Sequence, residues 1–187
     1  ISAGMHWLRQ LLGSTRSGSA TAQWRQDWSA AAAALDAAAA GALRERLAQL
    51  VSAPDDDLEI EREMLDGLEQ LLRFAADAAA HGLPAVATGH RVVGADRCHF
   101  SAPVSMPDDP AQPSGRLLLT NTRAVFVGGS RGITLPWHAV AQPVQNDRDL
   151  ILVRIDGAAL HRFRCNSYED VLTASFVARR LAGGRRV

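Results

Sequence analysis

Apolar and polar residues alternate in short runs through the C-terminal half of the chain. In the stretch 115–137, Leu117 and Leu119 share one face of a first run, which ends at the polar residues 120–122. A second apolar run, 124–127, ends at a stretch rich in glycine and serine. Runs of this kind bounded by Gly, Asn and Ser are typical of β-hairpins. The pattern therefore predicts a β-meander.

The same pattern continues to residue 165 and predicts seven strands. They are expected at 92–101, 115–121, 123–128, 132–136, 140–145, 150–155 and 160–165. Asp156 and Gly157 separate the last two runs, and an Asp-Gly pair is the strongest short-range hairpin signal. The segment 103–114 holds four prolines and two acids, so a loop is expected there.

One amphipathic helix is predicted after the last strand, over 168–181. Ser167 and Asp170 fit a capping box at its N-terminus. Its inward residues should close a core formed by large apolar residues of the strands. The expected core residues are Phe126, Trp137, Val153 and Phe163 from the β region, and Val171, Ala178 and Leu181 from the helix.

The N-terminal half has the longer periodicity of helices. A long helix is predicted over 21–52, with Trp24 and Trp28 on its apolar stripe, and a second over 56–81. Pro54 separates them, and the acids of 55–63 are expected to be a solvated helix start. The result is an antiparallel helical hairpin over 21–84. Its apolar stripes exceed what two helices bury in each other, so the hairpin is expected to pack on the β region or on a second copy, and to mediate protein association.

The first 20 residues are predicted to be a tail and linker, in which 1–4 resemble a remnant of an expression tag. Residues 14–20 read as a flexible Ser/Gly linker. Four apolar residues ahead of it could share one helical face: Trp7, Leu8, Leu11 and Leu12. Three interpretations stay open for this candidate wedge. It docks on its own domain or on a neighbour, it inserts into a membrane interface, or it is disordered.

Composition limits the class of protein. A hydrophobic content of 47% with 21% charge indicates a folded chain. No apolar run reaches the roughly 18 residues that span a bilayer. Residues 1–89 carry 7 Arg and 12 acids, and 90–187 carry 13 Arg and 8 acids. These balances of −5 and +5 are too small to indicate a nucleic-acid partner.

The choice of basic residues and the number of cysteines predict the source of the protein and its cellular compartment. All 20 basic residues are arginine, which together with the many alanines indicates a GC-rich bacterial genome. Cys98 and Cys165 are too few for a disulfide framework and are expected to be small buried hydrophobic residues. A cytoplasmic protein follows, either free or peripheral at the inner membrane.

No motif for catalysis or for a cofactor is found. The glycine-rich stretch 128–132 lacks the Lys-Ser/Thr ending of a phosphate loop and precedes a strand. The six histidines have no metal-ligand spacing with the cysteines. The chain is therefore interpreted as a non-enzyme with no cofactor and no metal. The candidate site is a surface for an acidic partner or an anion, formed by Arg154, Arg162 and Arg164 of the last two strands.

The sequence motif of the predicted meander resembles that of a known family. The series Gly115-x-Leu117-x-Leu119-Thr120-Asn121-x-Arg123-x-x-Phe126-x-Gly128 is similar to a pattern of bacterial pleckstrin-homology-like (PH-like) and GRAM-like domains. The resemblance covers residues 90–182. It implies a seven-stranded barrel capped by a C-terminal helix, and a module that binds lipids, peptides or proteins.

The expected fold class is α+β, a helical hairpin over 21–84 followed by a PH-like domain over 90–182 and a tail over 183–187. Lipid-binding relatives have a basic cluster on the first two strands and the loop between them. In this chain that loop holds Asp108 and Asp109 and no arginine. A protein-interaction or assembly module, with the hairpin mediating association, is therefore preferred. The alternative is a peripheral protein that binds anionic phospholipid.

Overall fold

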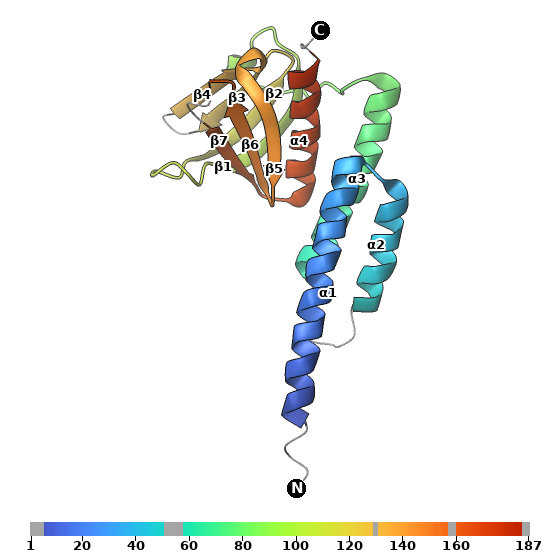
Figure 1. Ribbon diagram of the computed structural model, residues 1–187. Coiled ribbons are helices and arrows are strands. Elements are labelled where there is room, and N and C mark those ends of the chain that lie inside the picture. The colour runs from blue at the N-terminus through green and yellow to red at the C-terminus, as the bar shows by residue number, and fades with distance from the viewer. Residues whose placement is uncertain (1–5, 51–57, 129–130, 157–159, 185–187) are drawn as a thin grey trace. The chain divides into compact units, whose positions relative to one another are not determined.

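The computed structural model describes residues 6–50, 58–128, 131–156 and 160–184, except for the side chains of 6–18, 131 and 160 (Figure 1). The chain forms two compact units, Ile1–Leu72 and Arg73–Val187. Their boundary falls inside helix α3 (Glu59–His81). The predicted α+β class is confirmed by helices at the N-terminal end, a seven-stranded antiparallel sheet and a closing helix.

The first predicted helix is divided into two, α1 (His6–Ala34) and α2 (Ala37–Leu50). Leu35 has a left-handed backbone with φ of 54°. The side chain of Asp36 then accepts a hydrogen bond of 3.0 Å from the backbone N–H of Ala39. An aspartate in this position caps a new helix. The prediction of one helix over 21–52 was therefore wrong, because the apolar periodicity of the sequence continues through the turn at Leu35 and Asp36.

Helix α1 also includes residues 14–20, where the sequence predicted a flexible linker. Serine and glycine cost a helix only about 0.5–1 kcal/mol each relative to alanine. The alanine-rich segment that follows is a strong helix former, and helix extension from an existing turn is favourable.

Two tryptophans of α1 organise the core of the helical unit. Trp24 is fully buried and donates its indole N–H to the backbone oxygen of Leu43 in α2, at 2.9 Å. Trp28 donates in the same way to Met64 in α3, at 2.7 Å. The leucine stripes are also buried, with Leu47, Leu65, Leu68 and Leu71 at most 5% exposed. These four leucines are thus buried within the single chain.

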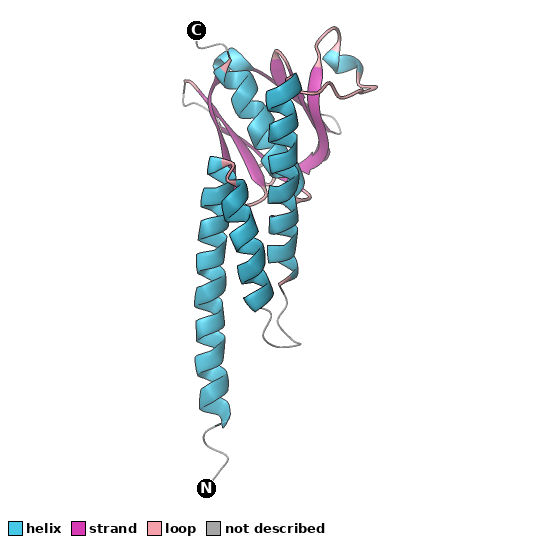
Figure 2. Ribbon diagram, turned by 90° about the vertical axis from the view of Figure 1, so that its right-hand side faces the viewer, coloured by secondary structure: helices cyan, strands magenta, loops and turns pink. Residues whose placement is uncertain are grey.

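The second unit is built on seven antiparallel strands. They are β1 (Cys98–Ser105), β2 (Ser114–Thr120), β3 (Arg123–Gly128), β4 (Arg131–Pro136), β5 (Val140–Asn146), β6 (Asp149–Arg154) and β7 (Leu160–Cys165). The strand order is β4-β3-β2-β1-β7-β6-β5. Helix α4 (Tyr168–Gly183) follows β7 and lies against the sheet (Figure 2). This order with a closing helix is the PH-like arrangement that the resemblance implied.

The core of the sheet unit is largely the predicted one. Phe126, Phe163, Trp137, Val171 and Ala178 are at most 2% exposed, and the rings of Phe126 and Phe163 lie 5.9 Å apart between centroids.

Val153 and Leu181 are only half-buried. In β6 the inward positions belong to Leu150 and Leu152, both fully buried, because side chains alternate along a strand. Val153 has the opposite phase and lies on the outer face.

The first strand lies later in the sequence than predicted. Residues 91–93 form a short 3₁₀ turn, and Gly94 has a positive φ of 59° that ends it. Strand β1 then runs to Ser105 and includes Pro103. Proline is tolerated here because β1 pairs with β7 only at Val104 and Ser105, so no β1–β7 hydrogen bond is lost.

Candidate functional site

Arg162 and Arg164 project from the outer face of β7, because Phe163 between them points into the core. Asp149, the first residue of β6, pairs with Arg164 across the ladder. Arg162 donates its Nε–H to Oδ2 of Asp149 at 2.6 Å, and Arg164 donates its Nε–H to Oδ1 at 2.8 Å. The structure thus brings these two predicted arginines together around one carboxylate.

Asp149 is a buried residue with 0% exposure, whereas the side chains of Arg162 and Arg164 are 31% and 46% exposed. Burial alone would raise the pKa of Asp149, but hydrogen bonds from Arg164 and Arg162 outweigh burial and the pKa is lowered. The hydrogen bond to Asp149 in turn raises the pKa of Arg164. Two guanidinium groups thus share one carboxylate, and the trio of Asp149, Arg162 and Arg164 has a net charge of +1.

A second carboxylate reaches the trio from the loop between β1 and β2. Asp108 accepts from Nη1 of Arg162 at 3.2 Å, and its side chain is 53% exposed. The contact joins residues 54 positions apart in sequence. In the sequence analysis, Asp108 served only to show that this loop is acidic. Asp149 was not identified as part of a site.

The third predicted arginine lies elsewhere. Arg154 pairs with Asp156 at 2.7 Å in the turn after β6. Nearby, burial and the charge of Arg154 both lower the pKa of His161, whose ring stacks on Phe163. Arg154 is therefore not part of the Asp149 trio, and the candidate site is reduced to Arg162 and Arg164.

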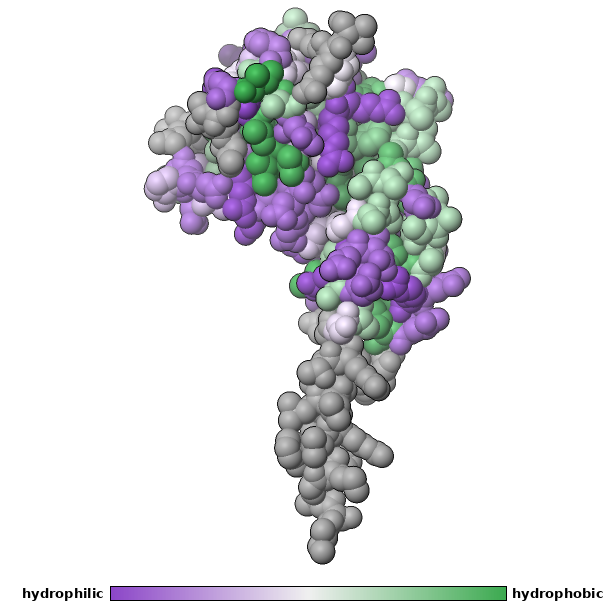
Figure 3. Space-filling model, in the orientation of Figure 1, coloured by the Kyte–Doolittle hydropathy of each residue, from purple (hydrophilic) through white to green (hydrophobic). Residues whose placement is uncertain are grey.

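Apolar side chains lie next to the trio on the outer face. Ile151 is the ladder partner of Arg162 and also of Val144 in β5. Ile151, Val144 and Val153 are half-buried, and Ile155 beyond them is 65% exposed. Figure 3 shows hydrophobic side chains gathered among charged ones on the visible face of the barrel. We call Val144, Ile151 and Val153 together with Arg162 and Arg164 the outer face.

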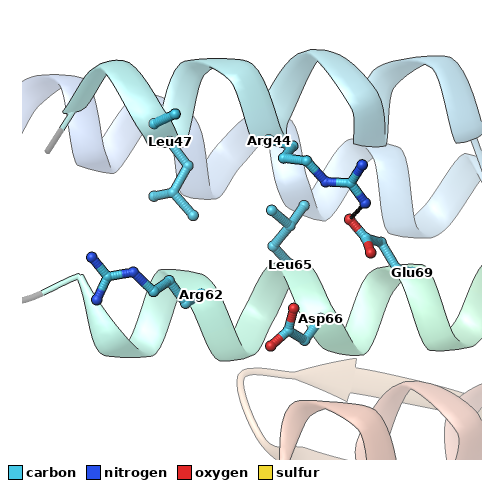
Figure 4. A pocket seen from close by; sticks show the side chains of 7 residues that line it. Arg44, Leu47, Arg62, Leu65, Asp66 and Glu69 are labelled. Atoms are coloured by element: carbon cyan, nitrogen blue, oxygen red, sulfur yellow. Dashed lines mark hydrogen bonds and ion pairs between the residues drawn. The ribbon is translucent and has the colours of Figure 1, made fainter.

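The helical unit has a groove of about 410 Å³ between α2 and α3 (Figure 4). Leu47 and Leu65 face each other across it, and Arg44 forms an ion pair with Glu69 over the same gap. Both leucines are 5% exposed, so the groove offers little apolar surface.

A buried acid of α3 corrects the prediction of a solvated helix start. Glu61 is only 2% exposed and accepts from Nε of Arg25 in α1, at 2.7 Å. It lies one turn before Met64 and Leu65 on the buried side of α3. Residues 55–57 of the same prediction lie outside the described residues. Helical spacing from Leu58, Leu65 and Leu68 would have placed Glu61 on the buried face.

The predicted wedge of Trp7, Leu8, Leu11 and Leu12 falls within helix α1. The side chains of these four residues lie outside the described part of the chain. Whether they contact a protein or a membrane stays a prediction.

The cysteines, the histidines and the glycine-rich stretch were the other candidates that the sequence offered. Cys98 and Cys165 are free and buried, as expected. The described ranges hold no group of three or more His, Cys, Asp or Glu arranged for a metal ion. Residues 128 and 131 pair as a hairpin between β3 and β4. Among the helices described, none combines the length and apolarity that crossing a membrane requires.

The motif that carries the family resemblance has a structural role. Trp137 donates its indole N–H to the backbone oxygen of Thr120 at 2.7 Å. Asn121 accepts from the backbone N–H of Arg97 through its side chain, and Thr122 donates to Asp96. These bonds fix the β2–β3 turn to the segment before β1, so these residues hold the fold together.

Comparisons with known proteins find solved structures that are similar to this chain only at low identity. No protein-family model and no curated protein matches the chain. A point mutant of the DH/PH domains of p115-RhoGEF is 11% identical with a TM-score of 0.44, over 80% of this chain and 48% of that chain. An N-terminally truncated linker-DH/PH form of p115-RhoGEF is 13% identical with a TM-score of 0.42, over 78% and 53%. This chain spans about half the length of those two.

Proposed function

We propose that the chain is a non-enzymatic PH-like binding module whose outer face recognises an acidic segment of a protein partner. The observation that supports it is the pair Arg162 and Arg164, fixed by the buried carboxylate of Asp149 next to half-buried apolar side chains.

Fixed arginines are suited to recognition. An arginine side chain loses about 2 kcal/mol of rotamer entropy when it is fully ordered. Asp149 orders both guanidinium groups before any partner arrives, so binding does not have to order them again. Because two arginines share one buried acid, a positive charge is left for the partner.

The apolar part of the outer face gives the partner a second kind of contact. Ile151 and Val153 lie beside the arginines and are half-buried without a partner. Protein interfaces combine arginine with a dehydrated apolar centre, and arginine is frequent among the residues that dominate binding energy. This combination favours a protein partner over a free anion.

A peripheral phospholipid-binding protein is the competing function. Anionic headgroups would also bind Arg162 and Arg164. The loop beside them, however, holds Asp108 and Asp109, and acidic side chains are repelled by an anionic membrane surface. An acidic protein segment would meet the same acids, so the protein partner ranks first because of the apolar side chains of Ile151 and Val153 beside the arginines.

Self-association through the helical unit is a further part of the proposal. The observation that supports it is Ile60 of α3, which is 47% exposed in the single chain. Light scattering after size-exclusion chromatography tests it. A monomer at all concentrations would remove this part and leave the outer face unaffected.

The outer face is tested by affinity capture from lysate of cells that encode the chain, with wild type, Arg164→Gln and Arg179→Gln as baits. Arg179 is exposed on α4, so its variant makes the same charge change away from the face. We expect a protein captured by wild type and Arg179→Gln and lost with Arg164→Gln.

Vesicles of phosphatidylserine and phosphatidylcholine are sedimented in parallel. The lipid function would be favoured instead if wild type sediments with the vesicles, Arg164→Gln does not, and no protein is captured from the lysate. Equal capture by all three baits would show that the arginine pair is not the binding surface.

A further inference from the structure

We infer that Asp108 is a built-in competitor for the arginine pair, which an acidic side chain of the partner must displace from Arg162. The inference rests on the proposed function and adds to it how access to the site is controlled. It follows from the different ways in which Asp149 and Asp108 contact the same guanidinium group.

Asp149 occupies one edge of each guanidinium group. Arg162 uses Nε and Nη2 for Asp149, and so does Arg164. The group has five N–H donors in a rigid planar fork, so the Nη1 end stays available. On Arg162 that end is already taken by the carboxylate of Asp108. The Asp108 carboxylate therefore stands where a partner carboxylate would bind.

The two acids differ in how firmly they are held. Asp149 is completely buried and accepts from both arginines, so its release from them would leave a buried charge unpaired. Asp108 is more than half exposed and has a single contact of 3.2 Å to Arg162. Exposed ion pairs of this kind contribute little. Asp149 is thus a permanent part of the site, and Asp108 is replaceable.

The loop that carries Asp108 closes on itself without the arginine. Met106 donates its backbone N–H to Pro113, Asp109 donates to Met106, and Gln112 donates to Asp109. The side chain of Asp109 also accepts from the backbone of Ala111 at 2.9 Å. Release of Asp108 from Arg162 therefore leaves the loop's own hydrogen bonds in place.

The spacing of the arginines indicates the form of the partner. Residues two apart on an extended strand point to the same side and lie roughly 6.5–7 Å apart. Arg162 and Arg164 have this spacing on β7. An extended segment with two acids separated by one residue matches it. The probe is therefore the peptide acetyl-Gly-Glu-Ile-Glu-Gly-amide, and the matched control replaces both glutamates by glutamine.

The test uses the full chain labelled with ¹⁵N, as wild type, Asp108→Asn and Asp109→Asn. Asp109→Asn makes the same charge change in the same loop and keeps a side-chain oxygen for Ala111. Each protein is titrated with both peptides at fixed low salt, and the Nε–H signals of Arg162 and Arg164 are followed. We expect the acidic peptide to bind Asp108→Asn about two- to fivefold more tightly than wild type. Asp109→Asn should bind like wild type, and the glutamine peptide should bind none of them.

Equal affinity for wild type and Asp108→Asn would overturn the competitor role and leave the proposed function in place. Equal tightening in Asp108→Asn and Asp109→Asn would also overturn it, because net charge would then explain the gain. If the acidic peptide binds none of the three proteins, both the inference and the acidic-segment function fail. Sedimentation of Asp108→Asn with phosphatidylserine vesicles in that case would identify a lipid surface as the ligand.

Discussion

At the scale of single residues, the two glycines of the family-like motif are required by the close approach of two strands. Gly115 of β2 lies beside Gly128 of β3, under the ring of Phe126. A Cβ atom on Gly115 would lie 2.3 Å from the backbone oxygen of Val127 and 2.6 Å from the Cα of Gly128. Backbone atoms cannot move aside as a flexible side chain can, so each glycine is fixed by geometry.

We predict that Gly115→Ala destabilises the sheet unit by about 1–3 kcal/mol, the usual cost of forcing extra atoms into a packed site. Gly132→Ala is the control, because its Cβ would meet only one atom, at 3.8 Å. Urea denaturation of both variants measures the difference. Equal stability of the two would show that β2 and β3 separate at little cost.

The two thiols should be inert in the folded protein. Burial raises the pKa of Cys98, and burial followed by the charges of Asp170 and Asp149 raises that of Cys165 to about 12. Since the thiolate is the reactive form, neither should react quickly with a disulfide reagent at pH 8. Both should react once guanidinium unfolds the chain. Rapid reaction of a thiol in native protein would contradict the burial described for that residue.

At the scale of elements, the strands were more predictable than the breaks between helices. Alternation fixes a strand locally, and the hairpin after β6 sets its register with β7. Leu35 and Asp36 lie within an unbroken helical pattern, and the turn there is favoured by the Asp36 cap and by the hydrogen bond from Trp24 to α2. Asp149 was missed for a related reason, because its partners lie 13 and 15 residues away.

Two substitutions in the turn between α1 and α2 should affect the stability of the chain differently. Leu35 has a left-handed backbone, which costs a residue with a Cβ about 1–2 kcal/mol, and its side chain is 37% exposed. Leu35→Gly should therefore stabilise the chain or leave it unchanged. Asp36→Ala should destabilise it by about 1 kcal/mol, because the cap to Ala39 is lost. Thermal unfolding followed by circular dichroism would detect both. A marked loss of stability in Leu35→Gly would contradict the assigned backbone.

The Asp149 trio should make stability depend on pH. The folded-state pKa of Asp149 is lowered, so its contribution is present above the unfolded value of about 3.9 and is lost as pH falls through the folded value. Asp149→Asn should cost about 1.5–3 kcal/mol at pH 7, as charged hydrogen bonds are lost. The difference from wild type should shrink below about pH 4.

Asp108→Asn is the control for this series, since it removes one exposed charge. It should change stability little at any pH. A difference between wild type and Asp149→Asn that stays constant from pH 7 to pH 3 would mean that the Asp149 charge does not contribute.

At the scale of the whole molecule, the order of elements could be predicted and the site only in part. Seven strands and a final helix follow from local patterns and from the resemblance. The contact of Asp108 with Arg162 joins two distant segments, and no local pattern encodes it. The helical unit shows the same limit, because the pairing of Arg25 with the buried Glu61 depends on how α1 and α3 pack together.

The strongest test of the architecture is removal of α4. Val171, Ala174, Val177 and Ala178 of this helix are all 0% exposed, so they fill the core of the sheet unit. Burying a valine contributes about 1.5–3 kcal/mol, and a domain's total stability is only about 5–15 kcal/mol. A chain that ends at residue 166 should therefore lose its cooperative melt, bind a hydrophobic dye or precipitate. A chain that ends at Gly184 is the control and should melt as wild type does. An unchanged cooperative melt of the shorter chain would show that α4 does not close the barrel, and the PH-like assignment would fall with it.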